Sequence, residues 1–260
     1  MKGAELRIGT SGWHYQHWRG DFYPADLPPA RMFSWYAQHF DTVEINNTFY
    51  RLPTEEVLLN WKKLAPPGFL FAVKGSRFIT HMKRLINPEK SVELFFSRVE
   101  LLGNTLGPIL FQLPPKWCVN RERLDEFLQV LPRHHRYVIE FRDDSWYVPS
   151  IYNLLSKYNV ALCIHDLHGA QSPIELTADS AYVRFHGTTG KYQGNYETKM
   201  LKDWAAHIAR WVPQLSHIFL YFNNDVGGYA VRNAESLLKI LEERGIQPRV
   251  AELDRVSNVR

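Results

Sequence analysis

The chain has 260 residues, of which 45% are hydrophobic and 22% are charged, as is usual for a soluble globular protein with a full core. Its two cysteines exclude a disulfide framework, and no apolar stretch has the length of a signal segment or a membrane span, so we predict a cytoplasmic protein without a membrane partner. The formal charge of +4 mildly favours anionic partners, but the basic residues are dispersed along the chain.

Strand-like apolar segments that end in a polar residue recur along the chain. After a first run that leads into Gly9, they end in these motifs: Val43-Glu44-Ile45-Asn46, Phe71-Ala72-Val73-Lys74, Leu110-Phe111-Gln112, Val138-Ile139-Glu140, Cys163-Ile164-His165-Asp166, Tyr182-Val183-Arg184-Phe185-His186 and Phe219-Leu220-Tyr221-Phe222-Asn223. Charged side chains are almost never buried unless they are paired. The recurring polar tips therefore predict a shared polar site.

Amphipathic segments with helix signals lie between the strand-like runs. We predict helices at about 31–40, 54–64, 88–102, 120–130, 148–158, 198–212 and 230–244, several of which open at a proline. Strand followed by helix, repeated about eight times, predicts an α/β fold in which residues 1–260 form a single TIM-like (β/α) barrel of about eight parallel strands. The segment between Asp166 and Tyr182 is short and contains Gly169 and Pro173, so we expect a loop in place of the sixth helix.

Alternation along the strands places many of the polar tips on one face. The sets that share a face are Glu44, Asn46 and Thr48; Ala72, Lys74 and Ser76; Val138, Glu140 and Arg142; Tyr182, Arg184 and His186; Tyr221, Asn223 and Asp225. In a barrel all of these sets can point inward. Because barrel active sites lie at the carboxyl ends of the strands, the tips fall where chemistry is normally done.

Several motifs resemble a known family. They are Ile8-Gly9-Thr10-Ser11-Gly12-Trp13, Trp18-Arg19-Gly20-Asp21-Phe22-Tyr23-Pro24, Glu44-Ile45-Asn46-Asn47-Thr48-Phe49-Tyr50, Phe111-Gln112-Leu113-Pro114, Arg184-Phe185-His186-Gly187 and Phe222-Asn223-Asn224-Asp225. Together they resemble the YecE-like proteins, the domain-of-unknown-function family numbered 72. The resemblance implies a TIM-barrel-like fold and does not imply an activity.

Four strand-tip residues are the candidates for catalysis. Glu140 and Glu44 are the acid–base candidates, with His186 as a further proton-transfer group, and Lys74 can hold a charge or act as a nucleophile if its pKa is lowered. The two glutamates come from strands that are not neighbours, so they can meet only across the barrel mouth. The alternative is that these groups neutralise one another in a buried polar network.

A larger set of residues is predicted to bind the substrate. Glycine-rich loops after the last two strands can bring backbone N–H groups to an anion, and aromatic residues near Tyr192 and Trp146 are expected to be exposed there. The tight turn at Gly12 is expected to place Trp13 and Tyr15 at the mouth. The predicted binding residues are Asn46, Tyr50, Gln112, Arg142, Trp146, Arg184, Gly187, Lys191, Tyr192, Asn223, Asn224, Gly227 and Gly228.

We predict no definite cofactor. A divalent metal remains open, and its ligands would be His165, Asp166 and His186, although their spacing matches no strong metal-binding signature. The chain contains neither a Gly-x-Gly-x-x-Gly motif nor a Walker sequence, so a dinucleotide-dependent oxidoreductase and a P-loop nucleotidase are without support.

Three functions follow as alternatives. The leading one is an enzyme, a hydrolase or an isomerase, that acts on a small phosphorylated, otherwise anionic or sugar-containing substrate at the carboxyl ends of the strands. The second is a nucleic-acid-binding protein or a metal-assisted, endonuclease-like repair protein that uses basic and aromatic residues. The third is a scaffold without catalysis.

Overall fold

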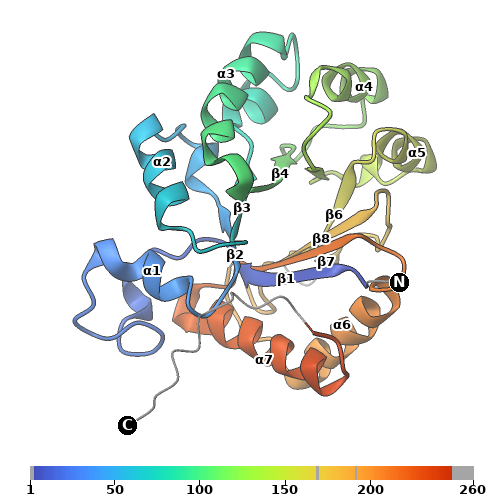
Figure 1. The fold of residues 1–260 in the computed structure, drawn as a ribbon. Helices are drawn as coiled ribbons and strands as arrows, with labels where there is room; N and C mark the ends of the chain where they lie inside the picture. Colours follow the sequence, from blue (N-terminus) through green and yellow to red (C-terminus); the bar gives the residue numbers. More distant parts are fainter. Residues whose placement is uncertain (1–2, 168–169, 191, 248–260) are drawn as a thin grey trace.

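The computed structural model describes residues 3–167, 170–190 and 192–247, in which helices surround a barrel of parallel strands (Figure 1). The strands are β1 (Glu5–Thr10), β2 (Thr42–Ile45), β3 (Leu70–Lys74), β4 (Leu106–Gln112), β5 (Tyr137–Glu140), β6 (Ala161–Leu167), β7 (Ala170–Gln171), β8 (Ser180–Phe185) and β9 (His217–Phe222). The α-helices are α1 (Met32–Tyr36), α2 (Glu55–Leu64), α3 (Glu89–Val99), α4 (Arg121–Val130), α5 (Pro149–Lys157), α6 (Thr198–Trp211) and α7 (Tyr229–Glu243).

The helices begin where the local sequence supplies a cap. The Thr54 hydroxyl accepts the N–H of Val57 (3.4 Å) at the start of α2, and the Asn120 side chain accepts the N–H of Arg123 (3.0 Å) at the start of α4. Pro149 opens α5, where its missing N–H costs nothing. Within the described residues, no helix is both long enough and apolar enough to cross a bilayer.

The eight barrel strands follow the order β1-β9-β8-β6-β5-β4-β3-β2, and every ladder between them is parallel. Between β1 and β2 the barrel closes through a single bridge of Ser11 with Glu44, and the N–H of Gly12 donates to the Glu44 carbonyl (2.8 Å). At Gly9 an added Cβ would lie 2.2 Å from the Thr42 carbonyl oxygen, so only glycine lets β1 approach β2 this closely. The predicted TIM-like barrel of parallel strands is confirmed.

The structure also confirms the loop expected in place of the sixth helix. The described residues between β6 and β8 form the two-residue strand β7, which pairs antiparallel with β6 through Asp166 and Gln171, and they contain no helix. The first helix is shorter than the predicted 31–40. After Tyr36 the N–H groups of Gln38 (3.0 Å) and His39 (2.9 Å) bond to the carbonyls of Trp35 and Tyr36, three residues back instead of four, so the last turn tightens and α1 ends.

The core has two layers. A large outer layer fills the space between the strands and the helices. The inner layer fills the barrel and consists of Ala72, Leu110, Val138, Ala161, Cys163, Tyr182, Phe219 and Tyr221. Ala72, Val138, Tyr182 and Tyr221 belong to the faces that alternation predicts to point inward, so that prediction is confirmed for these four strands.

Candidate active site at the carboxyl ends of the strands

One arginine joins the two acidic strand tips inside the barrel. Arg184 on β8 donates through Nη2 to Glu44 Oε1 on β2 (2.8 Å) and through Nη1 to Glu140 Oε2 on β5 (2.7 Å). The Ser11 hydroxyl donates to Glu44 Oε1 and the Tyr182 hydroxyl donates to Glu44 Oε2, and each of these distances is 2.6 Å. Glu44 and Glu140 are 0% exposed and Arg184 is 1% exposed. The two carboxylates thus meet across the barrel through a shared guanidinium.

Positive charge keeps both carboxylates ionised. Burial alone would raise the pKa of Glu140, but the nearby guanidinium groups of Arg142 and Arg184 lower this pKa well below its usual range. Burial also opposes ionisation of Glu44, whose pKa is nevertheless lowered by the charge and hydrogen bond of Arg184. A carboxylate held in this way is a weak base. These surroundings favour a structural role for both glutamates over the predicted proton transfer.

The hydrogen bonds of His186 define its tautomer. Its Nε2 lies 3.2 Å from Arg142 Nη2 and 3.4 Å from Arg184 Nη1, and a guanidinium can only donate. Nε2 is therefore an acceptor and the ring proton lies on Nδ1. Asn223 Nδ2 lies 3.1 Å from Nδ1, and because Nδ1–H needs an acceptor we assign this carboxamide the flipped orientation, with its oxygen toward the ring. Burial, followed by the charge of Arg184, lowers the pKa of His186 well below its usual range, so this buried imidazole is neutral at pH 7.

Lys74 adds a further cation to this network. It is 9% exposed, and its Nζ lies 4.6 Å from the centre of the Phe49 ring. Burial lowers the pKa of Lys74 to about 8, and the positive charge of Arg184 adds to this effect. Two arginines and two glutamates act on Lys74, so the five groups comprise three cations and two anions. Among these five groups, the cations therefore exceed the carboxylates by one.

The same positive charges also affect the pKa of a neighbouring histidine, His81. His81 follows β3 and is half-buried. Burial, together with the positive charges of Lys74, Arg77 and Arg142, lowers the pKa of His81 to about 4. His81 is thus neutral at pH 7 and does not add to the charge of the mouth.

Three of the predicted binding residues lie near these groups. Gln112 ends β4 opposite Glu140 in the register, and the partly exposed Tyr192 ring lies 5.7 Å from the His186 ring. Asn46 follows β2 and is half-buried, and its Oδ1 is buried without a hydrogen-bond partner among the described residues. The mouth thus brings together side chains from the five strands β2, β3, β4, β5 and β8 and from the loop after β8.

Other predicted binding residues have different surroundings. Trp146 was expected to be exposed, and this expectation is wrong: its ring is 0% exposed, stacks on Phe141 at 4.8 Å and donates Nε1–H to the Trp117 carbonyl (2.6 Å). Asn224 is fully buried and holds the fold through its own hydrogen bonds, whereas Tyr50 is 79% exposed. Trp146 therefore has no free ring face for a ligand.

The glycine-rich loops offer less to an anion than their sequence indicates. The N–H of Gly187 donates to a tyrosine hydroxyl (2.9 Å), and the N–H of Gly228 donates to the Asp225 carbonyl (3.0 Å). Gly227 adopts a positive φ of 73° next to Gly228. Lys191 lies outside the described residues. Two of the three N–H groups expected to hold an anion are therefore occupied within the protein.

The predicted metal ligands do not converge. The Asp166 carboxylate accepts the N–H of His186 (2.7 Å) through one oxygen and the Tyr196 hydroxyl through the other. The His165 Nε2 lies 3.1 Å from the Phe141 carbonyl. Within the part of the chain that the structure describes, one group of three side chains has potential ligand atoms within 4.8 Å of one another, and it lies before β4 and β5, at the opposite end of the barrel: Glu100, His134 and His135.

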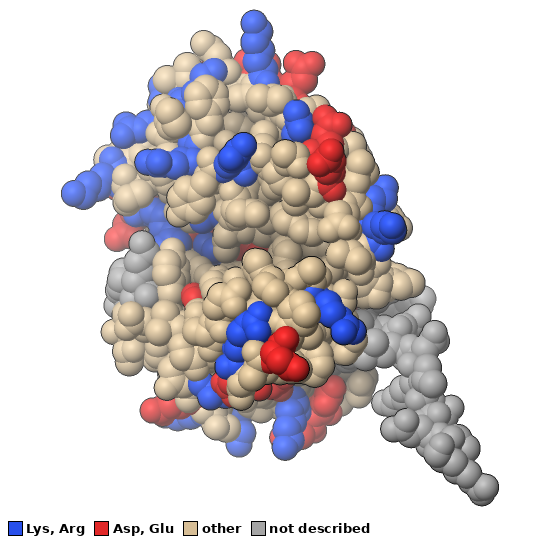
Figure 2. All heavy atoms as spheres, turned by 90° about the vertical axis from the view of Figure 1, so that its left-hand side faces the viewer, with Lys and Arg blue, Asp and Glu red and all other residues tan. Residues whose placement is uncertain are grey.

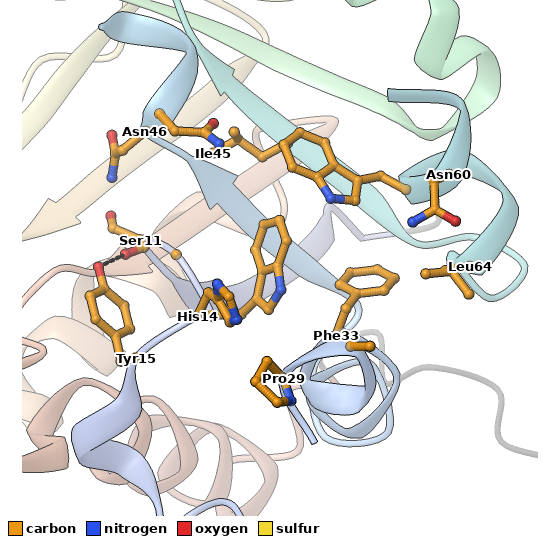
Figure 3. Close-up of a pocket in the computed structure, with 14 residues that line it drawn as sticks. Ser11, His14, Tyr15, Pro29, Phe33, Ile45, Asn46, Asn60 and Leu64 are labelled. Carbon is orange, nitrogen blue, oxygen red and sulfur yellow. Dashed lines mark hydrogen bonds between the residues drawn. The ribbon is translucent and has the colours of Figure 1, made fainter. Parts of the chain in front are cut away.

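A cavity of about 400 Å³ opens beside the mouth, between the ends of β1 and β2 and the helices α1 and α2 (Figure 3). Gly12 has a φ of 91° and begins the tight turn that was predicted here, and Trp13 and Tyr15 after it line the cavity. Asn60 and Trp61, both on α2, line the other side of the cavity. Sequence reasoning missed them, because an aromatic residue on an amphipathic helix usually packs in the core.

The comparisons with known proteins agree on one family. A family model described as "Protein of unknown function DUF72" matches residues 7–255. The UPF0759 protein YunF of Bacillus subtilis is 28% identical over 95% of this chain and 99% of its own length, and the UPF0759 protein YecE of Escherichia coli K12 is 27% identical over 68% and 73%. A crystal structure of a DUF72 family protein from Thermotoga maritima MSB8 has a TM-score of 0.84 at 27% identity and covers 91% of this chain and 99% of its own.

Proposed function

Since the chain belongs to the DUF72 family of proteins of unknown function, as its motifs indicate, we propose a function from the site itself. The mouth of the barrel binds a small substrate that carries an anionic group, such as a phosphorylated or other anionic sugar-containing molecule. The site catalyses a hydrolysis or an isomerisation of this substrate. Active sites of TIM barrels lie at this end of the strands.

The observation that carries the proposal is the uncompensated charge of Lys74. Arg142 and Arg184 are already paired with Glu140 and Glu44, so the third cation has no matching carboxylate among the five groups. Holding a buried ammonium costs free energy, as its lowered pKa shows. An anionic ligand would supply the missing negative charge.

Lys74 is also the group best suited to move a proton. With a pKa of about 8, a minor but useful fraction of its side chain is neutral at pH 7 and can accept a proton. Both nitrogens of His186 are held by neighbours, and both glutamates are held by arginines or hydroxyls. We therefore assign the arginine–glutamate network to positioning and Lys74 to anion binding and proton transfer.

The nucleic-acid alternative receives less support. On the face shown in Figure 2, Lys and Arg predominate at the upper left but are separated by uncharged residues, and elsewhere on this face they alternate with Asp and Glu, so they do not form a continuous basic band across it. A backbone-binding surface requires clustered cations along the path of the phosphates. A small anion at the buried mouth fits the charge distribution better.

The test compares wild type with Lys74→Met and with Lys90→Met, which removes an exposed lysine on α3. Calorimetry measures binding of sulfate and phosphate, and turnover is screened on sugar phosphates by phosphate release and by NMR for aldose–ketose conversion. We expect anion binding that is lost only in Lys74→Met. Wild-type protein that binds neither anion at millimolar concentration, or binding that survives in Lys74→Met, would contradict the proposal.

A further inference from the structure

We propose that the cavity beside the mouth is a subsite for a neutral sugar ring. The inference rests on the proposed function and extends it: the substrate is then a sugar whose anionic group lies at Lys74 and whose ring lies in the cavity. Four features of the cavity carry this inference, and they are its charge, its aromatic walls, its carboxamides and its connection to the mouth.

The described residues that line the cavity include no Asp, Glu, Lys or Arg, and His14 is the histidine among them. The lining residues from the β1 loop, α1, the end of β2 and α2 are aromatic, aliphatic or neutral polar residues. The neighbouring mouth, by contrast, is built around five charged groups. A charged ligand group would lose hydration in the cavity without gaining a partner, so the part of the ligand that enters it is neutral.

Two tryptophans and a phenylalanine provide the apolar walls. Trp13 lies edge to face with Trp61 (centroids 5.4 Å apart, 82° between planes) and with Phe33 (5.4 Å, 65°). Both tryptophans are only half-buried, so part of each ring faces the cavity. Large aromatic surfaces that remain partly open in a concave site favour the C–H face of a ring-shaped ligand.

Carboxamides provide the polar contacts. Asn46, Asn47 and Asn60 line the cavity, and Asn46 and Asn60 lie on opposite sides of it in Figure 3. A carboxamide can donate and accept, as a sugar hydroxyl can, and the two therefore pair in either direction. The Asn46 Oδ1 atom is buried without a hydrogen-bond partner in the described residues, so it is an acceptor that a ligand hydroxyl can satisfy.

The cavity and the mouth share a wall. Ser11 lines the cavity and also donates its hydroxyl hydrogen to Glu44, and the Tyr15 hydroxyl donates to the Ser11 carbonyl (2.7 Å). The charges of Glu44 and Arg184 both act on Tyr15, which places this cavity-lining ring close to the ionic network. Ser11 is therefore common to the cavity and the ionic network, and the proposed ligand would lie across it.

Calorimetry with four ligands tests the proposal: inorganic phosphate, a hexose phosphate, the free hexose and a nucleoside monophosphate. The variants are Trp61→Ala and Asn60→Ala, the second at an exposed position where the fold is not at risk, and Leu59→Ala as a control from the same helix that does not line the cavity. We expect wild type and Leu59→Ala to bind the hexose phosphate at least about tenfold more tightly than phosphate. Both cavity variants should lose this gain and keep their affinity for phosphate.

The outcomes separate the two proposals. If phosphate binds and the hexose phosphate binds no more tightly, the sugar subsite is wrong and the anion site stands. If neither phosphate compound binds while the free hexose binds in a Trp61-dependent way, the anion site is wrong and the sugar subsite stands. Tighter binding of the nucleoside monophosphate than of the hexose phosphate would overturn the sugar assignment in favour of a planar base.

Discussion

Replacing Lys74 with methionine should stabilise the protein while it removes anion binding. The side chain is 9% exposed, and its pKa falls from 10.5 to about 8, which means that the fold disfavours its charged form. The difference corresponds to about 3 kcal/mol. Methionine has a similar length and no charge to bury, so Lys74→Met should gain up to about this free energy of unfolding at pH 7.

The pH dependence follows from the same shift. From about pH 8 to 10.5, the unfolded chain still holds the Lys74 proton and the folded chain has released it, so the contribution of this group to stability increases with pH. The advantage of Lys74→Met over wild type should therefore shrink across this window. Buried groups such as Cys163, whose pKa is raised by burial, make the free energy of unfolding decrease with pH. Both proteins contain these groups, so the difference between their free energies of unfolding cancels this contribution.

Urea unfolding of wild type, Lys74→Met and Lys90→Met at pH 7, 8 and 9 measures these differences. Lys90 is exposed, so its replacement should change stability by less than about 0.5 kcal/mol. A Lys74→Met protein that is less stable than wild type at pH 7, or an advantage that does not change with pH, would refute the reasoning that burial holds this ammonium in an unfavourable state.

Three further substitutions test the site and its supports. Arg184→Met leaves two buried carboxylates without their shared partner and should lower the free energy of unfolding in urea by about 3–5 kcal/mol. The control Arg98→Met breaks a partly exposed ion pair and should lower it by less than about 1 kcal/mol. Equal losses would show that the network is not desolvated. Trp146→Phe removes a buried hydrogen bond and should cost about 1–3 kcal/mol with unchanged ligand affinity, and weaker binding in calorimetry would contradict its structural role. Gly187→Ala would place a Cβ 2.0 Å from the Gln193 carbonyl oxygen at a φ of 105°, so the melting temperature should fall by an amount equivalent to about 1–3 kcal/mol, and an unchanged value would argue against this strain.

Local patterns were sufficient to predict most of the fold. Alternation, strand length and capping residues such as Thr54 and Asn120 act over a few residues, so the sequence predicts seven helices and eight barrel strands close to where they occur. The shortness of the segment before Tyr182 likewise predicts the missing helix. The largest difference in length is at α1, which ends early because the N–H groups of Gln38 and His39 bond three residues back and tighten the last turn.

The site was predictable in part. Alternation places Glu44, Glu140 and Arg184 on inward faces, and the carboxyl ends of parallel strands must meet at one end of a barrel. That these side chains gather was therefore a property of the sequence. That Arg184 lies between both glutamates, and that Lys74 remains as the additional cation, depends on distances between strands that no local pattern encodes.

The sequence by itself determined the barrel, the missing helix and the end of the barrel where the polar tips gather, because periodicity and turn chemistry are local. Only the tertiary structure decided which of those groups are already satisfied. It buries Trp146 against Phe141, ties the Gly187 N–H to a tyrosine, and places Trp61 opposite Trp13 around an open cavity. Whether a polar or aromatic group is free for a ligand depends on partners far away in the chain, and those partners are set by packing.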